Sequence, residues 1–179
     1  MPNLTESLLG GAELSAECKA TIRPVALSPL KVMSMTDSAK ISDPAVIRRV
    51  LTTPATWAVV GLSTDTTRTA YGVAHWMHEG LGHRIIPVHP RAAEVWGEPG
   101  YQSLTQIPDG TAVAVVDCFV NSDRVGQVVD EAIANRDRLG IEAVWLQLGV
   151  IDEDAAQRAL QAGLDVVMNT CPMIEYPQL

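Results

Sequence analysis

Short apolar runs alternate along this chain with longer segments in which apolar residues recur every three or four positions. Nearly continuous short runs are typical of buried strands, and the longer recurrence is typical of amphipathic helices. One helical face after residue 69, for example, is formed by Ala70, Val73, Ala74 and Met77. The predicted strands are residues 57–61, 84–88, 112–118, 143–147 and 165–168.

The helical segments are bounded by residues that start or stop helices. Asp43 precedes Pro44, which gives the first helix an aspartate N-cap followed by proline at the first helical position. Ser122 and Asp152 are the predicted N-caps of two later helices. Because proline and glycine terminate helices, the predicted ends are Pro54, Gly80 or Gly82, Gly140 and Gly163.

This alternation of strands and helices predicts an α/β fold: a Rossmann-like, doubly wound, parallel five-stranded sheet in a three-layer α/β/α arrangement. The expected strand order is 3-2-1-4-5. Ligands of such folds bind at the carboxyl ends of the strands where the order reverses, which is expected beside the first strand. Residues 1–40 show no sustained period and are expected to be an N-terminal extension, and residues 41–179 are expected to form the domain.

The chain is organised around the first predicted strand and the turn that follows it. The strand runs directly into Gly61, then into a polar stretch that reaches residue 69 before the next helix. A strand, a glycine turn and a helix N-terminus together can hold a phosphate with backbone N–H groups. Of the G-x-G-x-x-G fingerprint only the first glycine is present, and Ser63 stands at the second position. An ordinary connection that needs Gly61 for its backbone angle is the alternative interpretation.

The end of the second predicted strand bears on the type of nucleotide. Proteins of this fold that bind NAD usually carry an acidic residue there, which bonds the ribose hydroxyls. This chain has His89 instead, followed two positions later by Arg91. A missing acid and a nearby base disfavour NAD and favour a ribose that carries a phosphate, as in NADP or coenzyme A. A solvated surface role for Arg91 is the alternative.

Composition excludes several classes of partner. A net charge of −8 and a pI near 4.9 argue against nucleic acid, because binding its phosphate backbone needs a basic surface. The three cysteines, Cys18, Cys118 and Cys171, are odd in number and far apart, which favours a reducing cytosol. No apolar run approaches the ~18 residues that span a membrane, and the first residues do not resemble a signal peptide. These features predict a cytoplasmic protein with a small-molecule ligand, and leave open a homo-oligomer or a protein partner.

Segments in a particular order and spacing suggest a family. From about residue 41 to 175 the chain resembles the small stand-alone coenzyme A-binding proteins, which are related to the coenzyme A-binding domain of succinyl-CoA synthetase α subunits. The segments that carry the resemblance are residues 58–63, 71–73, 86–90, 96–98, 101–104 with 107–108, 144–150, and 162–168 with Cys171. The family implies a Rossmann-like domain that binds the adenosine diphosphate part of coenzyme A at the strand ends.

The resemblance also implies a set of site residues, taken position by position. At the pyrophosphate and the start of the first helix after the turn it implies Gly61, Leu62, Ser63, Thr64, Arg68 and Tyr71. Around the adenosine it implies Val88, His89, Pro90, Arg91, Cys118, Phe119 and Val120. On the opposite wall it implies Gln147, Gly149 and Asn169.

Three positions depart from the family pattern. His89 stands where the family usually has asparagine. The family usually has a basic residue after the phenylalanine of the third strand, whereas Val120-Asn121 follow Phe119 here. Asn169-Thr170 replace the usual Asp-Arg pair. The last two departures remove charged groups from the expected rim of the site.

No catalytic constellation is evident in the sequence. His75 and His78 lie three residues apart, but no carboxylate or cysteine spacing completes a metal site with them, so they are interpreted as surface residues. Cys118 and Cys171 are interpreted as small apolar residues. The sequence therefore predicts a protein that binds coenzyme A or an acyl-CoA without catalysis. The alternatives are an NADP-dependent reductase, a partner-dependent acyl-CoA ligase subunit, and a regulatory protein with a vestigial nucleotide pocket.

Overall fold

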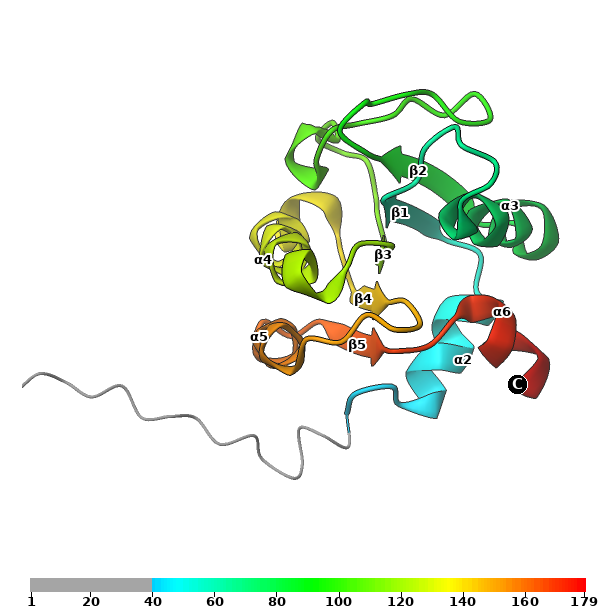
Figure 1. Ribbon diagram of the computed structural model, residues 1–179. Helices are drawn as coiled ribbons and strands as arrows, with labels where there is room; N and C mark the ends of the chain where they lie inside the picture. The colour runs from blue at the N-terminus through cyan, green and yellow to red at the C-terminus, as the bar shows by residue number, and fades with distance from the viewer. Residues whose placement is uncertain (1–39) are drawn as a thin grey trace, which may run out of the picture. The chain divides into compact units, whose positions relative to one another are not determined.

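The computed structural model describes residues 40–179, so the predicted extension lies outside the described residues except for Lys40 (Figure 1). The strands are β1 (Thr56–Val60), β2 (Arg84–Val88), β3 (Val115–Cys118), β4 (Ala143–Leu146) and β5 (Asp165–Met168). The helices are α2 (Pro44–Thr52), α3 (Thr69–Leu81), α4 (Ser122–Leu139), α5 (Glu153–Gln161) and α6 (Pro172–Glu175), with short 3₁₀ turns η1 (Leu104–Gln106) and η2 (Tyr176–Gln178). Within this range, no helix combines the length and apolar character needed to cross a membrane.

All five strands pair in parallel, in the order β2-β1-β3-β4-β5. The predicted fold class, a doubly wound parallel five-stranded α/β sheet, is thereby confirmed. The predicted order 3-2-1-4-5 differs in one place, since β3 lies between β1 and β4 rather than outside β2. The reversal in strand order therefore falls between β1 and β3.

Pro87 explains why β2 is the edge strand. A proline has no N–H to give to a ladder and is confined to strands with a free edge. The Pro87 carbonyl faces away from β1 and accepts a hydrogen bond from the Tyr101 N–H at 3.0 Å. The missing N–H thus lies on the outer side of the sheet, where no further strand of the sheet needs it as a hydrogen-bond donor. A sheet with β3 outside β2 would need a donor at this position.

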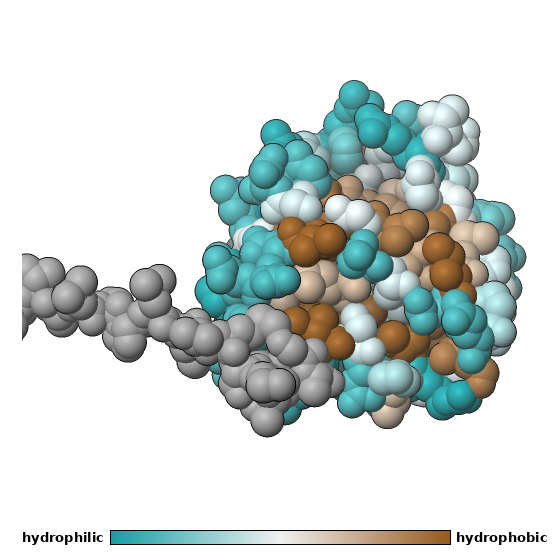
Figure 2. All heavy atoms as spheres, turned by 60° about the horizontal axis from the view of Figure 1, so that its bottom comes forward, coloured by the Kyte–Doolittle hydropathy of each residue, from teal (hydrophilic) through white to brown (hydrophobic). Residues whose placement is uncertain are grey.

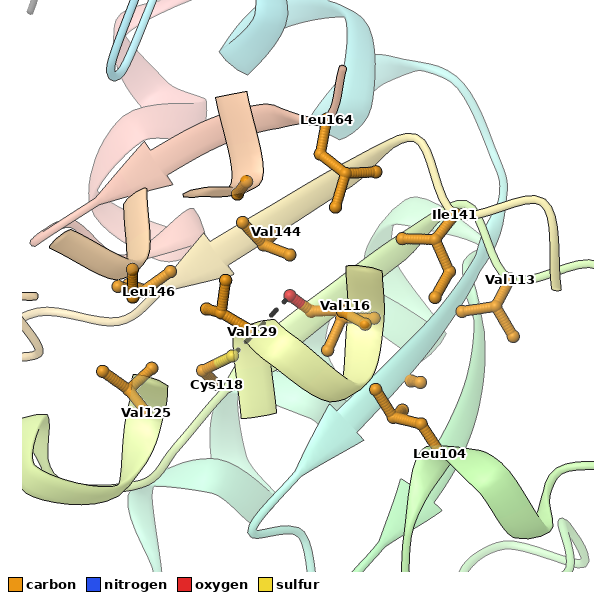
Figure 3. Close-up of a cluster of buried hydrophobic side chains, with 14 of the residues drawn as sticks. Leu104, Val113, Val116, Cys118, Val125, Val129, Ile141, Val144, Leu146 and Leu164 are labelled. Carbon is orange, nitrogen blue, oxygen red and sulfur yellow. Dashed lines mark hydrogen bonds between the residues drawn. The ribbon is translucent and has the colours of Figure 1, made fainter. Parts of the chain in front are cut away.

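Helices cover both faces of the sheet, as Figure 1 shows. Alternate strand residues point into two apolar cores, one beneath α4 and α5 and the other beneath α2 and α3. Figure 3 shows the first core, in which Val116 and Cys118 of β3 lie against Val125 and Val129 of α4. The second core contains the two buried tryptophans, Trp57 and Trp145, with ring centroids 5.9 Å apart.

The helix starts follow the predicted caps in two cases and depart from them in one. Asp43 Oδ1 accepts a hydrogen bond from the Ala45 N–H at 2.8 Å, and Asp152 Oδ1 accepts one from the Ala155 N–H at 2.9 Å. Ser122 is not a cap but the first residue of α4, and its hydroxyl accepts a hydrogen bond from the Ile151 N–H. This serine therefore ties the start of α4 to the loop after β4.

Among residues 40–179, the exposed large apolar side chains all follow β4 or β5 in the sequence: Leu148, Ile151, Met173, Ile174 and Tyr176. Figure 2 shows apolar patches on the face that comes forward from the bottom of Figure 1, where α2, α5 and β5 lie. The rest of the large apolar side chains of the described chain are at least partly buried.

Candidate pocket at the strand ends

A pocket of about 730 Å³ opens at the carboxyl ends of β1, β2 and β3. It lies at the point where the strand order reverses, which is where ligands of doubly wound sheets bind. Its lining comes from the loops after these strands and from the first turns of α3 and α4. The lining residues are Val60, Gly61, Ser63, Asp65, Arg68, Thr69, Ala70, Val88, His89, Pro90, Arg91, Gln102, Phe119, Val120, Asn121, Arg124, Gln127 and Val128.

Gly61 holds the loops after β1 and β3 against each other. Its φ of +104° lies in a region that side chains with a Cβ rarely adopt. A Cβ at this position would lie 2.5 Å from the Phe119 carbonyl oxygen, which is backbone and has no freedom to move aside. Glycine is therefore required both for the turn and for the close approach of the Phe119 backbone.

The N-terminus of α3 opens into the pocket without a cap. No side chain between residues 40 and 179 bonds its first N–H groups, and Thr69 and Ala70 of its first turn line the pocket. The Asp65 carboxylate, in the loop before the helix, accepts hydrogen bonds from Thr67, from the N–H at 3.0 Å and from the hydroxyl at 2.6 Å. These hydrogen bonds lower the pKa of Asp65. The helix N-terminus, with its partial positive charge, thus remains available to an anion.

Positive charge dominates the rim of the pocket. Three arginines line it, Arg68, Arg91 and Arg124, and the single carboxylate in the lining is Asp65. The Arg68 Nε lies 3.6 Å from the Asp65 carboxylate, so one of the arginines is partly neutralised. The pocket is thus locally cationic in a chain whose net charge is −8.

His89 is held as a neutral imidazole at this rim. Its Nδ1 accepts a hydrogen bond from the Arg91 N–H at 3.2 Å, which leaves Nε2 to carry the proton. Burial lowers the pKa of His89, and the nearby charges of Arg91 and Arg68 lower it further. An anion bound beside these groups would act in the opposite direction and favour the protonated form.

The loop between β2 and η1, which carries this rim, is anchored on β2 and on α3. Arg84 binds the Glu98 carboxylate with two hydrogen bonds of 2.8 Å. The Trp96 indole N–H donates to the Tyr71 hydroxyl at 2.9 Å, and the His78 ring stacks on Trp96 with centroids 5.7 Å apart. The predicted surface histidine His78 is therefore part of an aromatic anchor, and the Tyr71 hydroxyl is engaged by this anchor rather than by the pocket.

The structure brings nine of the predicted site residues together around the pocket and leaves seven outside its lining. The nine are Gly61, Ser63, Arg68, Val88, His89, Pro90, Arg91, Phe119 and Val120. The seven are Leu62, Thr64, Tyr71, Cys118, Gln147, Gly149 and Asn169.

Several of these seven have other partners. Leu62 and Cys118 are fully buried in the two cores, and burial together with the charge of Asp117 raises the pKa of the Cys118 thiol (Figure 3). The Gln147 side chain donates to Asp117 Oδ1 at 2.7 Å, and both residues are buried. Asn169 Oδ1 accepts a hydrogen bond from the Gly149 N–H at 2.8 Å. Two residues of the predicted opposite wall are therefore bonded to each other.

Nine lining residues were not among those predicted: Val60, Asp65, Thr69, Ala70, Gln102, Asn121, Arg124, Gln127 and Val128. Arg124 and Gln127 are spaced three residues apart on α4, so they lie on one face of its first turns. The sequence could have indicated them, because a helix that follows a strand begins at the edge of the sheet where that strand ends. The first residues of such a helix are therefore candidates for the site. Among residues 40–179, no group of three or more His, Cys, Asp or Glu side chains is placed to hold a metal ion.

Comparison with known proteins relates this chain to proteins of the same fold. Residues 55–177 match the family model described as "CoA binding domain". The chain is 32% identical over 132 residues to the uncharacterized protein YneT of Bacillus subtilis (strain 168), which covers 74% of this chain and 93% of YneT. A hypothetical protein from Pyrococcus horikoshii OT3 superposes with a TM-score of 0.68 and 32% identity, covering 84% of this chain and 99% of that one.

A more distant structure shares the fold alone. It is a dinucleotide-forming acetyl-coenzyme A synthetase from Ca. Korarchaeum cryptofilum, at 24% identity and a TM-score of 0.57. The match covers 69% of this chain but 27% of the synthetase, so the common fold corresponds to about a quarter of that larger protein.

Proposed function

Because this chain belongs to the family of CoA binding domains, we propose that it binds coenzyme A or an acyl-CoA in the pocket beside Gly61. The observation that carries the proposal is the position of the pocket in a member of this family. It lies at the reversal point of the sheet, next to a glycine turn and an uncapped helix N-terminus. Its volume of about 730 Å³ falls within the range of small-molecule and cofactor sites.

In this proposal the pyrophosphate lies against the turn after β1. The backbone N–H groups of Ser63, Thr69 and Ala70, which line the pocket, would donate to its oxygens. Each charge-assisted contact of this kind contributes on the order of 1 kcal/mol. Arg68, at the start of α3, would balance the remaining negative charge. Of these residues, Ser63 and Arg68 are also implied at the pyrophosphate by the resemblance to coenzyme A-binding proteins.

The adenosine would lie between the ends of β2 and β3. His89 and Pro90 line one side of the pocket there, and Phe119 and Val120 line the other. Phe119 and Val120 are half-buried, so apolar surface remains to contact a purine ring. The absence of an acid at His89 disfavours NAD, which in this fold relies on a carboxylate at the ribose hydroxyls.

We propose a binding role without a chemical step of its own. The reactive side chains at the ends of the central strands, Asp117 and Cys118, are fully buried and do not line the pocket. A cytosolic location and association with a protein partner or a second copy of the chain stay predictions from the sequence.

A ligand panel tests the proposal. Thermal unfolding is measured with coenzyme A, acetyl-CoA, NADP, NAD and ATP in parallel. A ligand at about 100 times its dissociation constant should add about 2.7 kcal/mol to the free energy of unfolding. Stabilisation by coenzyme A or acetyl-CoA, and not by NAD, is expected. Stabilisation by NADP without any by coenzyme A would overturn the proposal in favour of a reductase, and no stabilisation at all would favour a vestigial pocket.

Two tryptophan variants locate the site. Val120→Trp adds an indole to the lining of the pocket and should abolish the stabilisation by coenzyme A. Leu148→Trp is the matched control, because this position also follows a strand, is 62% exposed and lies outside the pocket lining. Equal loss in both variants, or undiminished stabilisation of Val120→Trp, would place the ligand elsewhere.

A further inference from the structure

Two segments of the pocket lining come from different parts of the chain and need a fixed separation. One is the start of α3, where Thr69 and Ala70 line the pocket. The other is the loop between β2 and η1, residues 89–103, which we call the rim loop and which contributes residues 89–91 to the lining. A ligand that contacts both segments binds well only where their distance matches its own length.

Trp96 of the rim loop joins these two segments. Its indole N–H donates a hydrogen bond of 2.9 Å to the hydroxyl of Tyr71, the third residue of α3. The Trp96 and Tyr71 rings also meet edge to face, with centroids 5.0 Å apart. The rings of His75 and His78 lie 5.3 and 5.7 Å from the Trp96 ring. The rim loop is therefore attached to α3 at the residue that directly follows the pocket-lining Ala70.

The backbone of the rim loop is strained on both sides of this attachment. Ala92 and Trp96 have φ angles of +46° and +51°, a left-handed region that residues with a Cβ rarely adopt. Such conformations cost free energy and persist where the surrounding contacts hold them. Ala92 directly follows Arg91 of the pocket lining. The place of the lining residues in this loop thus depends on the contacts that anchor the loop.

The rim loop is anchored to β2 and to the core as well as to α3. Arg84 of β2 binds the Glu98 carboxylate with two hydrogen bonds, and Val95 is buried in the core beneath α2 and α3. Among residues 40–179, the hydrogen bond between Trp96 and Tyr71 is the one that joins the loop to α3. This bond is therefore the contact best placed to set the separation of the two lining segments.

Resting on the proposed function, we propose that Trp96 and Tyr71 are positioning residues, which hold the rim loop at the distance from the start of α3 at which one ligand contacts both. Tyr71 then supports ligand binding through Trp96 and not by contact with the ligand. Two observations support this role: the Tyr71 hydroxyl accepts the Trp96 N–H, and Tyr71 lies outside the pocket lining. The resemblance to coenzyme A-binding proteins, by contrast, implies Tyr71 at the ligand itself.

Limited trypsin digestion of the full chain without ligand measures the release of the rim loop. Trypsin cleaves after arginine, and Arg91 is an exposed arginine in this loop. Because cleavage needs an opened segment, its rate follows the population of the released loop. Tyr71→Phe removes the hydrogen bond but keeps the ring, and it should raise the rate of cleavage after Arg91 about fivefold. Trp96→Ala should raise this rate further. Mass spectrometry identifies the fragment that ends at Arg91.

Trp76→Ala is the matched control for the loss of a tryptophan ring. Trp76 is also half-buried, its ring meets that of Tyr176 edge to face with centroids 5.6 Å apart, and it lies outside the pocket lining. The control variant should change the rate of cleavage after Arg91 by less than about twofold, because effects at sites without shared partners are independent. Its affinity for coenzyme A should equally stay at the wild-type value.

A double-mutant cycle with coenzyme A, measured by calorimetric titration, separates positioning from direct contact. Trp96→Ala should weaken binding about tenfold, because a released loop must be ordered again when the ligand binds. Tyr71→Ala should weaken binding to a similar extent. The double variant should be at most about twofold weaker than the weaker single variant, because both changes break the same attachment. Tyr71→Phe, which keeps the ring beside Trp96, should bind within about threefold of wild type.

The outcomes separate this inference from the proposed function. Cleavage after Arg91 at the wild-type rate in Tyr71→Phe and Trp96→Ala would overturn the inference and leave the proposed function intact. Effects of Tyr71→Ala and Trp96→Ala that multiply in the double variant would also overturn it, since Tyr71 would then contact the ligand itself. If the wild-type chain does not bind coenzyme A, the proposed function is wrong and the role in ligand binding is lost with it. The digestion would then still decide whether Trp96 and Tyr71 anchor the rim loop.

Discussion

The polar groups at the carboxyl edge of the sheet are free in one half of the edge and bonded to one another in the other half. After β1, β2 and β3 the edge is hollow, and among the described residues the Arg91 and Arg124 side chains and the N–H groups of Thr69 and Ala70 at the start of α3 have no partners. After β4 and β5 the polar groups bond to one another. Gln147 donates to Asp117, the Gly149 N–H donates to Asn169, and the Trp145 indole N–H donates to the Thr170 carbonyl.

The contrast shows where binding capacity is located in this fold. All five strands end at the same edge, so position at a strand end does not by itself make a residue available to a ligand. A donor whose hydrogen bond is already made must break it to bind anything else, at a cost similar to what the new contact gains. Donors without an internal partner bind at no such cost. The half with free donors is therefore the half that we assign to coenzyme A.

The largest expected effect comes from a substitution of Gly61, which lies between the loops after β1 and β3 in the first of these halves. Gly61→Ala places a Cβ 2.5 Å from the Phe119 carbonyl oxygen at a φ of +104°. Backbone strain and the clash together should lower the free energy of unfolding by about 3 kcal/mol, measured by urea denaturation. Coenzyme A affinity should fall as well, because the loop after β1 must move.

Gly82→Ala separates strain from clash. Gly82 also has a positive φ, of +71°, but a Cβ there meets no atom within 4 Å. Its cost should be near 1 kcal/mol, the penalty for a left-handed backbone alone. If Gly61→Ala costs no more than Gly82→Ala, the close contact between the loops after β1 and β3 does not constrain the pocket.

The sequence predicted the elements of the fold because each has its own period and stop signals. The order of the strands depends on which strands pair, which a hydrophobic pattern does not encode. Pro87 was the available signal, since a proline favours an edge strand, and it argues against a central place for β2. The turn at Tyr176–Gln178, beside α6 at the end of the chain, was not predicted because it is too short to show a period.

The residues of the pocket could be predicted where the backbone conformation determines their place. They could not be predicted where the hydrogen-bond partners of the side chains determine it. Gly61 follows from the turn that a strand-to-helix connection requires. Gln147 and Asn169 were predicted from the resemblance to coenzyme A-binding proteins, but their amides bond to Asp117 and to Gly149, which no linear pattern reveals. Arg124 lies three residues into α4, and its place in the pocket depends on how that helix is oriented.

Asp117, which bonds to Gln147, should make the stability of the folded chain depend on pH. Complete burial raises the pKa of Asp117 to about 8, against 3.8 for the free side chain, although the hydrogen bond from Gln147 partly opposes this. The folded state then binds a proton that the unfolded state has released. The stabilisation is complete below pH 3.8 and is lost as the pH rises through 8.

Urea denaturation between pH 6.5 and 8.5 measures this effect. Wild-type stability should fall with pH by up to about 1.4 kcal/mol per pH unit, the limit for one proton. Asp117→Asn removes the ionisation while keeping an acceptor for Gln147, so its stability should be nearly independent of pH. This pH range also avoids the titration of His83. Burial lowers the pKa of His83, so the loss of stability that it causes on acidification falls below pH 6.5. Parallel slopes in the two proteins would show that another group titrates.

The smallest expected effect on ligand affinity tests whether the ligand reaches the half of the edge that follows β4 and β5. Asn169 has a φ of +59°, and its side chain accepts the Gly149 N–H. Asn169→Gly removes that hydrogen bond without backbone strain and should cost about 1 kcal/mol of stability, and Asn169→Ala should cost somewhat more. Coenzyme A affinity should change less than threefold in both, because the free donors lie on the other half of the edge. A tenfold loss in both variants would instead show that the ligand extends across the sheet to β5, as the resemblance to coenzyme A-binding proteins implies.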